Sequence, residues 1–179
     1  MKHAAFYRNL NLGRANCPTR AQFEAAFLEA GAESAQSFLV NGTMVFAAGT
    51  DARARRVVTA ANKVLHATCG LKEPAFLRRV DALAAWVATD PFRHVARDRV
   101  YECCVTFLHP KAALPPDAVR RSARGDVELV DARADAVLSL VHVVGRSPGS
   151  PNAFLEKLLG LPATTRAWNT IVRLVDKHA

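Results

Sequence analysis

The pair Asn41-Gly42, set between apolar runs at residues 37–40 and 43–47, is the feature that most constrains the fold. Asn and Gly adopt positive φ more readily than other residues, and a two-residue type I′ turn needs positive φ at both central positions. Apolar runs on either side of such a turn are typical of paired antiparallel strands. The sequence therefore predicts a β-hairpin here, with a type I′ turn at Asn41-Gly42.

Regular elements surround this hairpin in the first half of the chain. Thr19 and Gln22 have the spacing of a capping box, which predicts the start of a helix. We expect a strand at residues 3–7, a helix at 19–30, a helix from 50 or 51 to 69 that Gly70 ends, and a fourth strand at 74–80. With the hairpin, this order is β-α-β-β-α-β, that of a ferredoxin-like (split β-α-β) sheet.

The second half has a similar order. We expect strands at 101–109, 127–130 and 137–144, and helices at 115–123, 151–159 and 165–177, the last in place of a closing strand. The polar and basic segment 90–99 is the expected boundary. The predicted fold class is therefore α+β, with ferredoxin-like subdomains at residues 1–92 and 93–179, the second ending in helices.

Charge limits the partners without selecting one. The chain has 24 Lys and Arg against 16 Asp and Glu, a formal net charge of +8, which suits an anionic partner such as nucleic acid. Residues 1–90 and 91–179 each carry +4, so the charge is not concentrated in a tail. Scattered charge of this kind is typical of a solvated surface.

Apolar segments and cysteines bear on location and chemistry. No apolar run reaches the roughly 18 residues of a membrane span, and Arg8 falls where a secretory signal would be hydrophobic. We therefore expect a cytoplasmic protein with no membrane partner. Cys17, Cys69, Cys103 and Cys104 show no metal-ligand spacing, so we expect reduced thiols, no metal and no cofactor.

The loop at residues 8–16 is the candidate binding site. It follows a strand and precedes a helix, a position in which backbone amides can receive an anion. Its polar residues include two Arg, three Asn and the flexible Gly13. The alternative is that the asparagines only satisfy the backbone of their own loop.

Arg166 is the candidate contribution from the other end of the chain. If it lies in the first turn of the last helix, it and Arg8 or Arg14 can converge on one anion at the subdomain junction. Alternatively, Trp168 anchors the helix and Arg166 binds nearby carbonyls or a carboxylate. The complete set of candidate anion ligands is Arg8, Asn9, Asn11, Gly13, Arg14 and Arg166.

Three classes of function stay open at this stage. A binding protein for a small anionic, phosphate-bearing ligand is favoured by the loop and the charge. A nucleic-acid-binding protein is the second, although few aromatic residues are left to stack on bases. An enzyme is the third: His109 and His142 are possible general bases, but neither has a nucleophile or acid at motif spacing. The catalytic residues and the oligomeric state are left open.

Three segments resemble a known family. They are Tyr-Arg-Asn-Leu-Asn-Leu-Gly at residues 7–13, the hairpin at 38–46, and Leu-Leu-Gly-Leu-Pro-Ala-Thr-Thr-Arg-Ala-Trp-Asn-Thr-Ile-Val-Arg-Leu at 158–174. They are similar to the bacterial domain-of-unknown-function family 1697. The resemblance implies a cytoplasmic α+β protein of two ferredoxin-like subdomains, and it implies no activity. This chain departs from the family at Gly13-Arg14, where two glycines are usual, and at the Asn-Gly-Thr of the hairpin.

Overall fold

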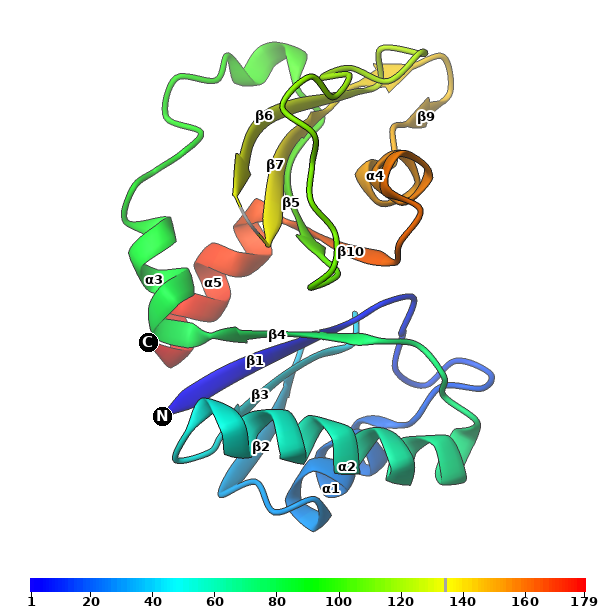
Figure 1. The fold of residues 1–179 in the computed structure, drawn as a ribbon, viewed down its shortest axis with the longest axis vertical. Helices are drawn as coiled ribbons and strands as arrows, with labels where there is room; N and C mark the ends of the chain where they lie inside the picture. The colour runs from blue at the N-terminus through cyan, green and yellow to red at the C-terminus, as the bar shows by residue number, and fades with distance from the viewer. Residues whose placement is uncertain (134) are drawn as a thin grey trace. The chain divides into compact units, whose positions relative to one another are not determined.

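The chain forms two compact units in a computed structural model that describes residues 1–133 and 135–179. Unit 1 comprises Met1–Ala85 and Leu174–Ala179, and unit 2 comprises Trp86–Arg173. Each unit is built on one antiparallel four-stranded sheet (Figure 1). The protein is therefore mixed α+β, as expected. The boundary expected after residue 92 stays a prediction.

Unit 1 has the element order that the sequence predicts. Its sheet has the order β2-β3-β1-β4 with every pair antiparallel, and α1 and α2 cover one face of it (Figure 1). The elements are β1 (Lys2–Tyr7), α1 (Arg20–Glu29), β2 (Ser34–Phe38), β3 (Thr43–Ala47), α2 (Asp51–Cys69) and β4 (Ala75–Arg79), after which α3 (Val80–Val87) begins.

Caps fix the ends of both long helices, as the sequence predicts. The Thr19 hydroxyl accepts from the Gln22 amide at 3.2 Å, and the Gln22 side chain accepts from the Thr19 amide at 2.8 Å. Thr50 caps α2 through the amide of Arg53. Gly70 ends α2 at φ +72°, where a side chain would be strained.

Tyr7 lies at the centre of the core of unit 1. Its ring centroid is 5.2 Å from that of Phe23 and 6.3 Å from that of Phe27, both edge-on. Its hydroxyl donates to Asn62 of α2. Burial raises the pKa of Tyr7 far above its usual value, so the residue is a neutral phenol that joins the sheet to both helices.

The end of α5 (Trp168–His178) belongs to unit 1. Lys2 donates to the His178 carbonyl at 2.8 Å. The His178 ring lies edge-on to Phe38, with 5.9 Å between centroids. Both ends of the chain therefore contribute to the same unit.

The hairpin is confirmed, but its turn differs from the predicted one. Phe38 is opposite Thr43, so four residues, 39–42, connect the strands. Positive φ occurs at Leu39 and Gly42 and not at Asn41. The two-residue type I′ turn is therefore wrong. The connection packs against the end of β1, where Tyr7 donates its amide to the Gly42 carbonyl, and against the loop that follows, where Leu12 donates to the Val40 carbonyl.

Unit 2 has the strand order β10-β5-β7-β6, again antiparallel throughout. One buried cluster joins this sheet to α4 through Leu155 and the strand residues Leu108 and Val137. The elements are η1 (Arg97–Arg99), β5 (Glu102–Leu108), β6 (Val127–Arg133), β7 (Ala136–Val141), the ribbon β8 (Val143–Val144) and β9 (Ser147–Pro148), α4 (Pro151–Leu159) and β10 (Ala163–Ala167).

Two expectations for unit 2 are wrong. A closing strand does exist: β10 pairs with β5, with Arg166 opposite Val105, and the last helix begins only at Trp168. The β-branched pair Thr164-Thr165 favours this extended backbone. The expected helix at 115–123 is absent, because Pro116 disfavours helical backbone at Pro115 and neither proline donates a hydrogen bond.

No helix within the described ranges is long and apolar enough to cross a bilayer.

Gly42 provides a test of the hairpin connection. A Cβ at Gly42 would lie 2.6 Å from the Leu10 Cβ, whereas one at Gly70, which has nearly the same φ, meets nothing within 4 Å. We expect Gly70→Ala to lower the free energy of unfolding by about 1 kcal/mol. Gly42→Ala should lower it by about 3 kcal/mol, because overlap adds to the backbone strain. Equal losses in urea unfolding would contradict this packing.

Candidate functional site

Several backbone amides in and next to the candidate loop are already hydrogen-bonded. The amide of Leu12 donates to the Val40 carbonyl at 2.9 Å, and that of Gly13 to the Pro18 carbonyl at 3.0 Å. The amides of Arg14 and Cys17 also donate to carbonyls within the loop. These amides are therefore already bonded. The side chains of Arg14 and Asn11 are exposed and can contact an anion here.

Arg8 and Asn9 meet at a carboxylate that the sequence analysis did not assign. Arg8 Nη1 lies 2.8 Å from Glu73 Oε2, and Asn9 Nδ2 lies 3.4 Å from Glu73 Oε1. Asn9 has φ +51°, which Asn tolerates better than most residues. Glu73 thus neutralises Arg8 and ties this loop to the segment before β4.

Arg166 is a buried residue of β10 in unit 2, only 7% exposed. Its Nη1 donates to Thr164 Oγ1 at 2.9 Å and to the Thr165 carbonyl at 2.8 Å. Burial lowers its pKa to about 10, so it stays charged at neutral pH. These contacts match the alternative in which Arg166 binds nearby carbonyls. The site shared with the N-terminal loop stays a prediction.

Substitution of Arg166 separates a structural role from a surface role. Arg166→Ala should lower the free energy of unfolding by about 2–4 kcal/mol, because buried acceptors lose their donor and a cavity is left. Arg146→Ala is the control, since Arg146 is exposed and should change stability by less than about 0.5 kcal/mol. If both variants melt like the wild type, the burial of Arg166 is contradicted.

The two histidines singled out from the sequence have modest contacts. His109 Nδ1 accepts from the Lys111 amide at 3.1 Å. His142 Nε2 lies 3.5 Å from a carboxylate oxygen of Glu128. These contacts hold a turn and a strand edge, and they identify no reaction.

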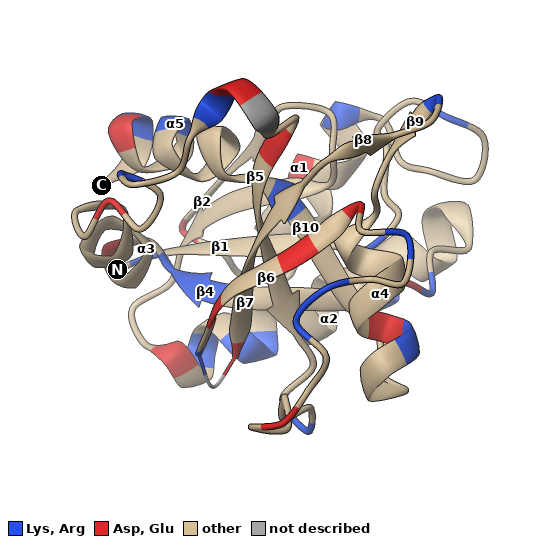
Figure 2. Ribbon diagram, turned by 90° about the horizontal axis from the view of Figure 1, so that it is seen from above, with Lys and Arg blue, Asp and Glu red and all other residues tan. Residues whose placement is uncertain are grey.

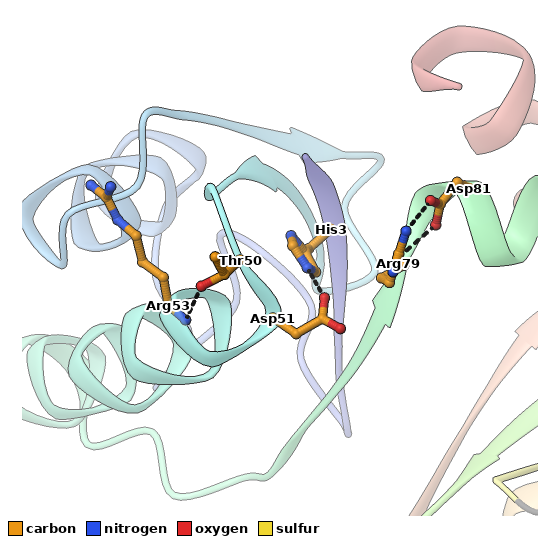
Figure 3. Close-up of polar contacts among 6 residues, drawn as sticks. All are labelled: His3, Thr50, Asp51, Arg53, Arg79 and Asp81. Carbon is orange, nitrogen blue, oxygen red and sulfur yellow. Dashed lines mark hydrogen bonds and ion pairs between the residues drawn. The ribbon is translucent and has the colours of Figure 1, made fainter.

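A third histidine, His3, was missed by the sequence analysis. It is 1% exposed, its Nε2 lies 2.9 Å from Asp51 Oδ1, and its ring stacks on Phe46. Figure 3 shows the imidazole directed at Asp51, the first residue of α2. The Nδ1 atom is buried and has no partner among the described residues. The bond between His3 and Asp51 therefore joins β1 to the first residue of α2.

Arg79 and Asp81 lie near this pair (Figure 3). Arg79 is opposite His3 in the register of β1 and β4, and its Nε donates to Asp81 Oδ1 at 2.9 Å. The hydrogen bond from His3 lowers the pKa of Asp51, and the charge of Arg79 lowers it further. The hydrogen bond from Arg79 lowers the pKa of Asp81 in the same way.

The lowered pKa of Asp51 predicts a contribution to acid stability. A carboxyl whose pKa is depressed by folding stabilises the protein above its ordinary value near 3.8. That contribution is lost as the pH falls through the lowered pKa. We expect Asp51→Asn to be less stable than the wild type at pH 7 and to lose less stability below about pH 4.

Urea unfolding across this pH range measures the difference. Asp117→Asn is the control, because Asp117 is exposed and makes no contact among the described residues. An acid profile of Asp51→Asn that parallels that of the wild type would show that the bond to His3 does not stabilise the fold.

A cleft of about 410 Å³ lies within unit 2, at the start of β5. We call it the Arg97 cleft. Arg97 Nη1 donates to Cys103 Sγ at 3.1 Å, and Arg97 has no ion pair among the described residues. The lining residues are Asp90, Arg97, Tyr101, Glu102, Cys103, Trp168, Asn169 and Val172.

Aromatic packing supports one wall of the Arg97 cleft. The ring centroid of Trp168 lies 5.3 Å from that of Trp86 and 5.5 Å from that of Phe92, both edge-on. The Arg133 guanidinium lies 4.8 Å from the centroid of Trp86. By contrast, Tyr101 is 63% exposed, so its ring is available to a ligand.

The thiols near the cleft are poor nucleophiles. All four cysteines are free. Burial raises the pKa of Cys103, despite the opposing charge of Arg97, and raises that of Cys104 to about 12. The thiolate is the reactive form of cysteine, so both are neutral at pH 7. Within the described part of the chain, no three His, Cys, Asp or Glu residues are placed to hold a metal.

Sequence reasoning missed the Arg97 cleft because its residues come from three separated segments. Segment 90–99 was interpreted only as a polar boundary. The sequence offers only the pair Asp90-Pro91 as a local signal; the structure adds that Asp90 has φ +41°, an uncommon conformation for a residue other than Gly.

Comparisons with known proteins give a family and a fold. The sequence matches the family described as "Protein of unknown function (DUF1697)" over residues 1–135. No curated protein matches it. A solved structure, that of the conserved bacterial protein SP0830 from Streptococcus pneumoniae, is similar with a TM-score of 0.65 and 13% identity, covering 98% of this chain and 97% of that one. At this identity the likeness concerns the fold alone. On the match over residues 1–135, the chain belongs to the DUF1697 family.

Proposed function

We propose that this protein binds a small ligand with an anionic group, and that Arg97 receives that group. The observation that carries the proposal is the partner of Arg97, which is the neutral thiol of Cys103 instead of a carboxylate. Hydrogen bonds from guanidinium to carboxylate or phosphate are stronger than those between neutral groups. An incoming anion would therefore find an uncompensated charge.

The size and lining of the Arg97 cleft support this proposal. Its volume of about 410 Å³ falls in the usual range for small-molecule sites. Asn169 offers an amide for further hydrogen bonds, and the exposed ring of Tyr101 offers a face for stacking. The N-terminal loop is a second candidate, because Arg14 is exposed and makes no side-chain contact among the described residues.

The finer description of the fold also belongs to the proposal. Both sheets have the strand order of a split β-α-β unit: β2-β3-β1-β4 in unit 1 and β10-β5-β7-β6 in unit 2. This order supports two ferredoxin-like units, the second of which lacks its first helix. A cytoplasmic location remains part of the same proposal.

The alternative functions have less support. Lys and Arg are interspersed with Asp and Glu on helices, strands and loops (Figure 2), and Tyr101 is the one exposed aromatic residue among those described. A platform for stacking several bases needs more than one. An enzyme that uses a cysteine nucleophile has no support from two neutral thiols.

Inorganic phosphate and small carboxylates are suitable first probes. An anion at 100 times its dissociation constant should add about 2.7 kcal/mol to the free energy of unfolding, which thermal-shift and calorimetric titration both detect. Arg97→Gln should abolish this gain and keep the melting temperature of the unliganded protein. Arg146→Gln, at an exposed residue of the same unit, should leave the gain in stability from the anion unchanged.

Arg14→Gln separates the two candidate sites. If Arg14→Gln loses the stabilisation by the anion and Arg97→Gln keeps it, the ligand binds the N-terminal loop and the assignment to the Arg97 cleft is wrong. If no small molecule with an anionic group stabilises the wild type, the proposed function fails altogether.

A further inference from the structure

We infer that the ligand of the Arg97 cleft is a zwitterion: a small molecule that carries an ammonium group as well as its anionic group. The inference rests on the proposed function and narrows its ligand class. It comes from the balance of charge in the lining, where one guanidinium faces a cavity together with two carboxylates, those of Asp90 and Glu102.

Of the two carboxylates, that of Glu102 is the better candidate to bind the ammonium group of the ligand. Its carboxylate has no hydrogen bond or ion pair among the described residues, and partial burial raises its pKa. A carboxylate that loses hydration without gaining a partner is stabilised by a cation at contact distance. The obvious neighbouring cation, Arg97, donates to Cys103 instead.

Asp90 adds a second carboxylate on a constrained backbone. Its side chain also makes no contact among the described residues. Its φ of +41° lies in the left-handed region, which Asp adopts more readily than most residues other than Gly. The conformation places an acidic residue in the lining of the cleft.

Because of these two carboxylates, a ligand that carries only negative charge is not the best fit to the cleft. A bare phosphate would gain from Arg97 but would meet repulsion from Asp90 and Glu102. An ammonium group on the same molecule converts that repulsion into attraction. A zwitterion such as an α-amino acid or an aminoalkyl phosphate therefore satisfies all three charged side chains.

A neighbouring hollow indicates where the rest of the ligand can extend. A second cleft of about 270 Å³ is also lined by Tyr101 and Glu102, together with Thr165 and Asn152. Because Tyr101 and Glu102 line both clefts, a ligand whose ammonium group contacts Glu102 can extend from the Arg97 cleft into the second one.

The test compares molecules that differ by one charge. α-Amino acids and aminoalkyl phosphates are titrated calorimetrically beside their N-acetyl derivatives, which keep the anion and lose the ammonium group. At least one zwitterion should bind about tenfold more tightly than its derivative. Glu102→Gln should remove most of that preference without weakening the binding of the derivative. Asp117→Asn, a control at an exposed acid of the same unit, should preserve it.

The outcomes distinguish this inference from the function on which it rests. If anions bind through Arg97 but each N-acetyl derivative binds as tightly as its parent, the zwitterion is ruled out and the anion site stands. If the preference survives Glu102→Gln, Glu102 is not the partner and the inference is equally wrong. If nothing in either series binds, both proposals fail together.

Discussion

Antiparallel pairing on both sides of one central strand is the constraint on which each unit depends. In unit 1 that strand is β1, which lies between β3 and β4 and has five buried residues. In unit 2 it is β5, which lies between β10 and β7 and has six. Strands buried this way are mostly apolar, with His3 in β1 and Thr106 in β5 as buried polar exceptions, so exposed polar groups lie in the segments that flank them. The N-terminal loop follows β1, and the Arg97 cleft lies where β5 begins.

Local chemistry allowed much of this fold to be predicted from the sequence. The capping box expected at Thr19 is present, and Thr50 and Ser150 cap the starts of α2 and α4, because a cap is decided by residues within one turn. Prediction failed where a longer-range partner decides the outcome. The sequence places Thr165 in the last helix and Thr164 just before it, but pairing with β5 makes both part of a strand. At Gly42, the close approach of Leu10 leaves no room for a side chain.

The site was harder to predict for the same reason. A polar loop with glycine is visible in sequence, whereas the Arg97 cleft is assembled from Asp90, the start of β5 and the first turns of α5. Arg8 shows how a distant partner bears on the role of a charge. Its charge suggested a role in binding, but Glu73, 65 residues away, already neutralises it. The sequence therefore identifies candidate charged residues, but the structure is needed to show which of them are already paired with another residue and which can bind a ligand.

The NMR signal of the Arg97 side chain tests directly whether Arg97 is the uncompensated cation that binds an anion. We would follow the Arg Nε–Hε resonances of the ¹⁵N-labelled protein by NMR during a titration with inorganic phosphate. The account predicts a saturable chemical-shift change at Arg97, accompanied by changes at the backbone amides of Tyr101 and Glu102, while the Arg146 resonance does not change. Saturable shifts confined to Arg14 and its loop, or no saturable shift at any arginine, would contradict it.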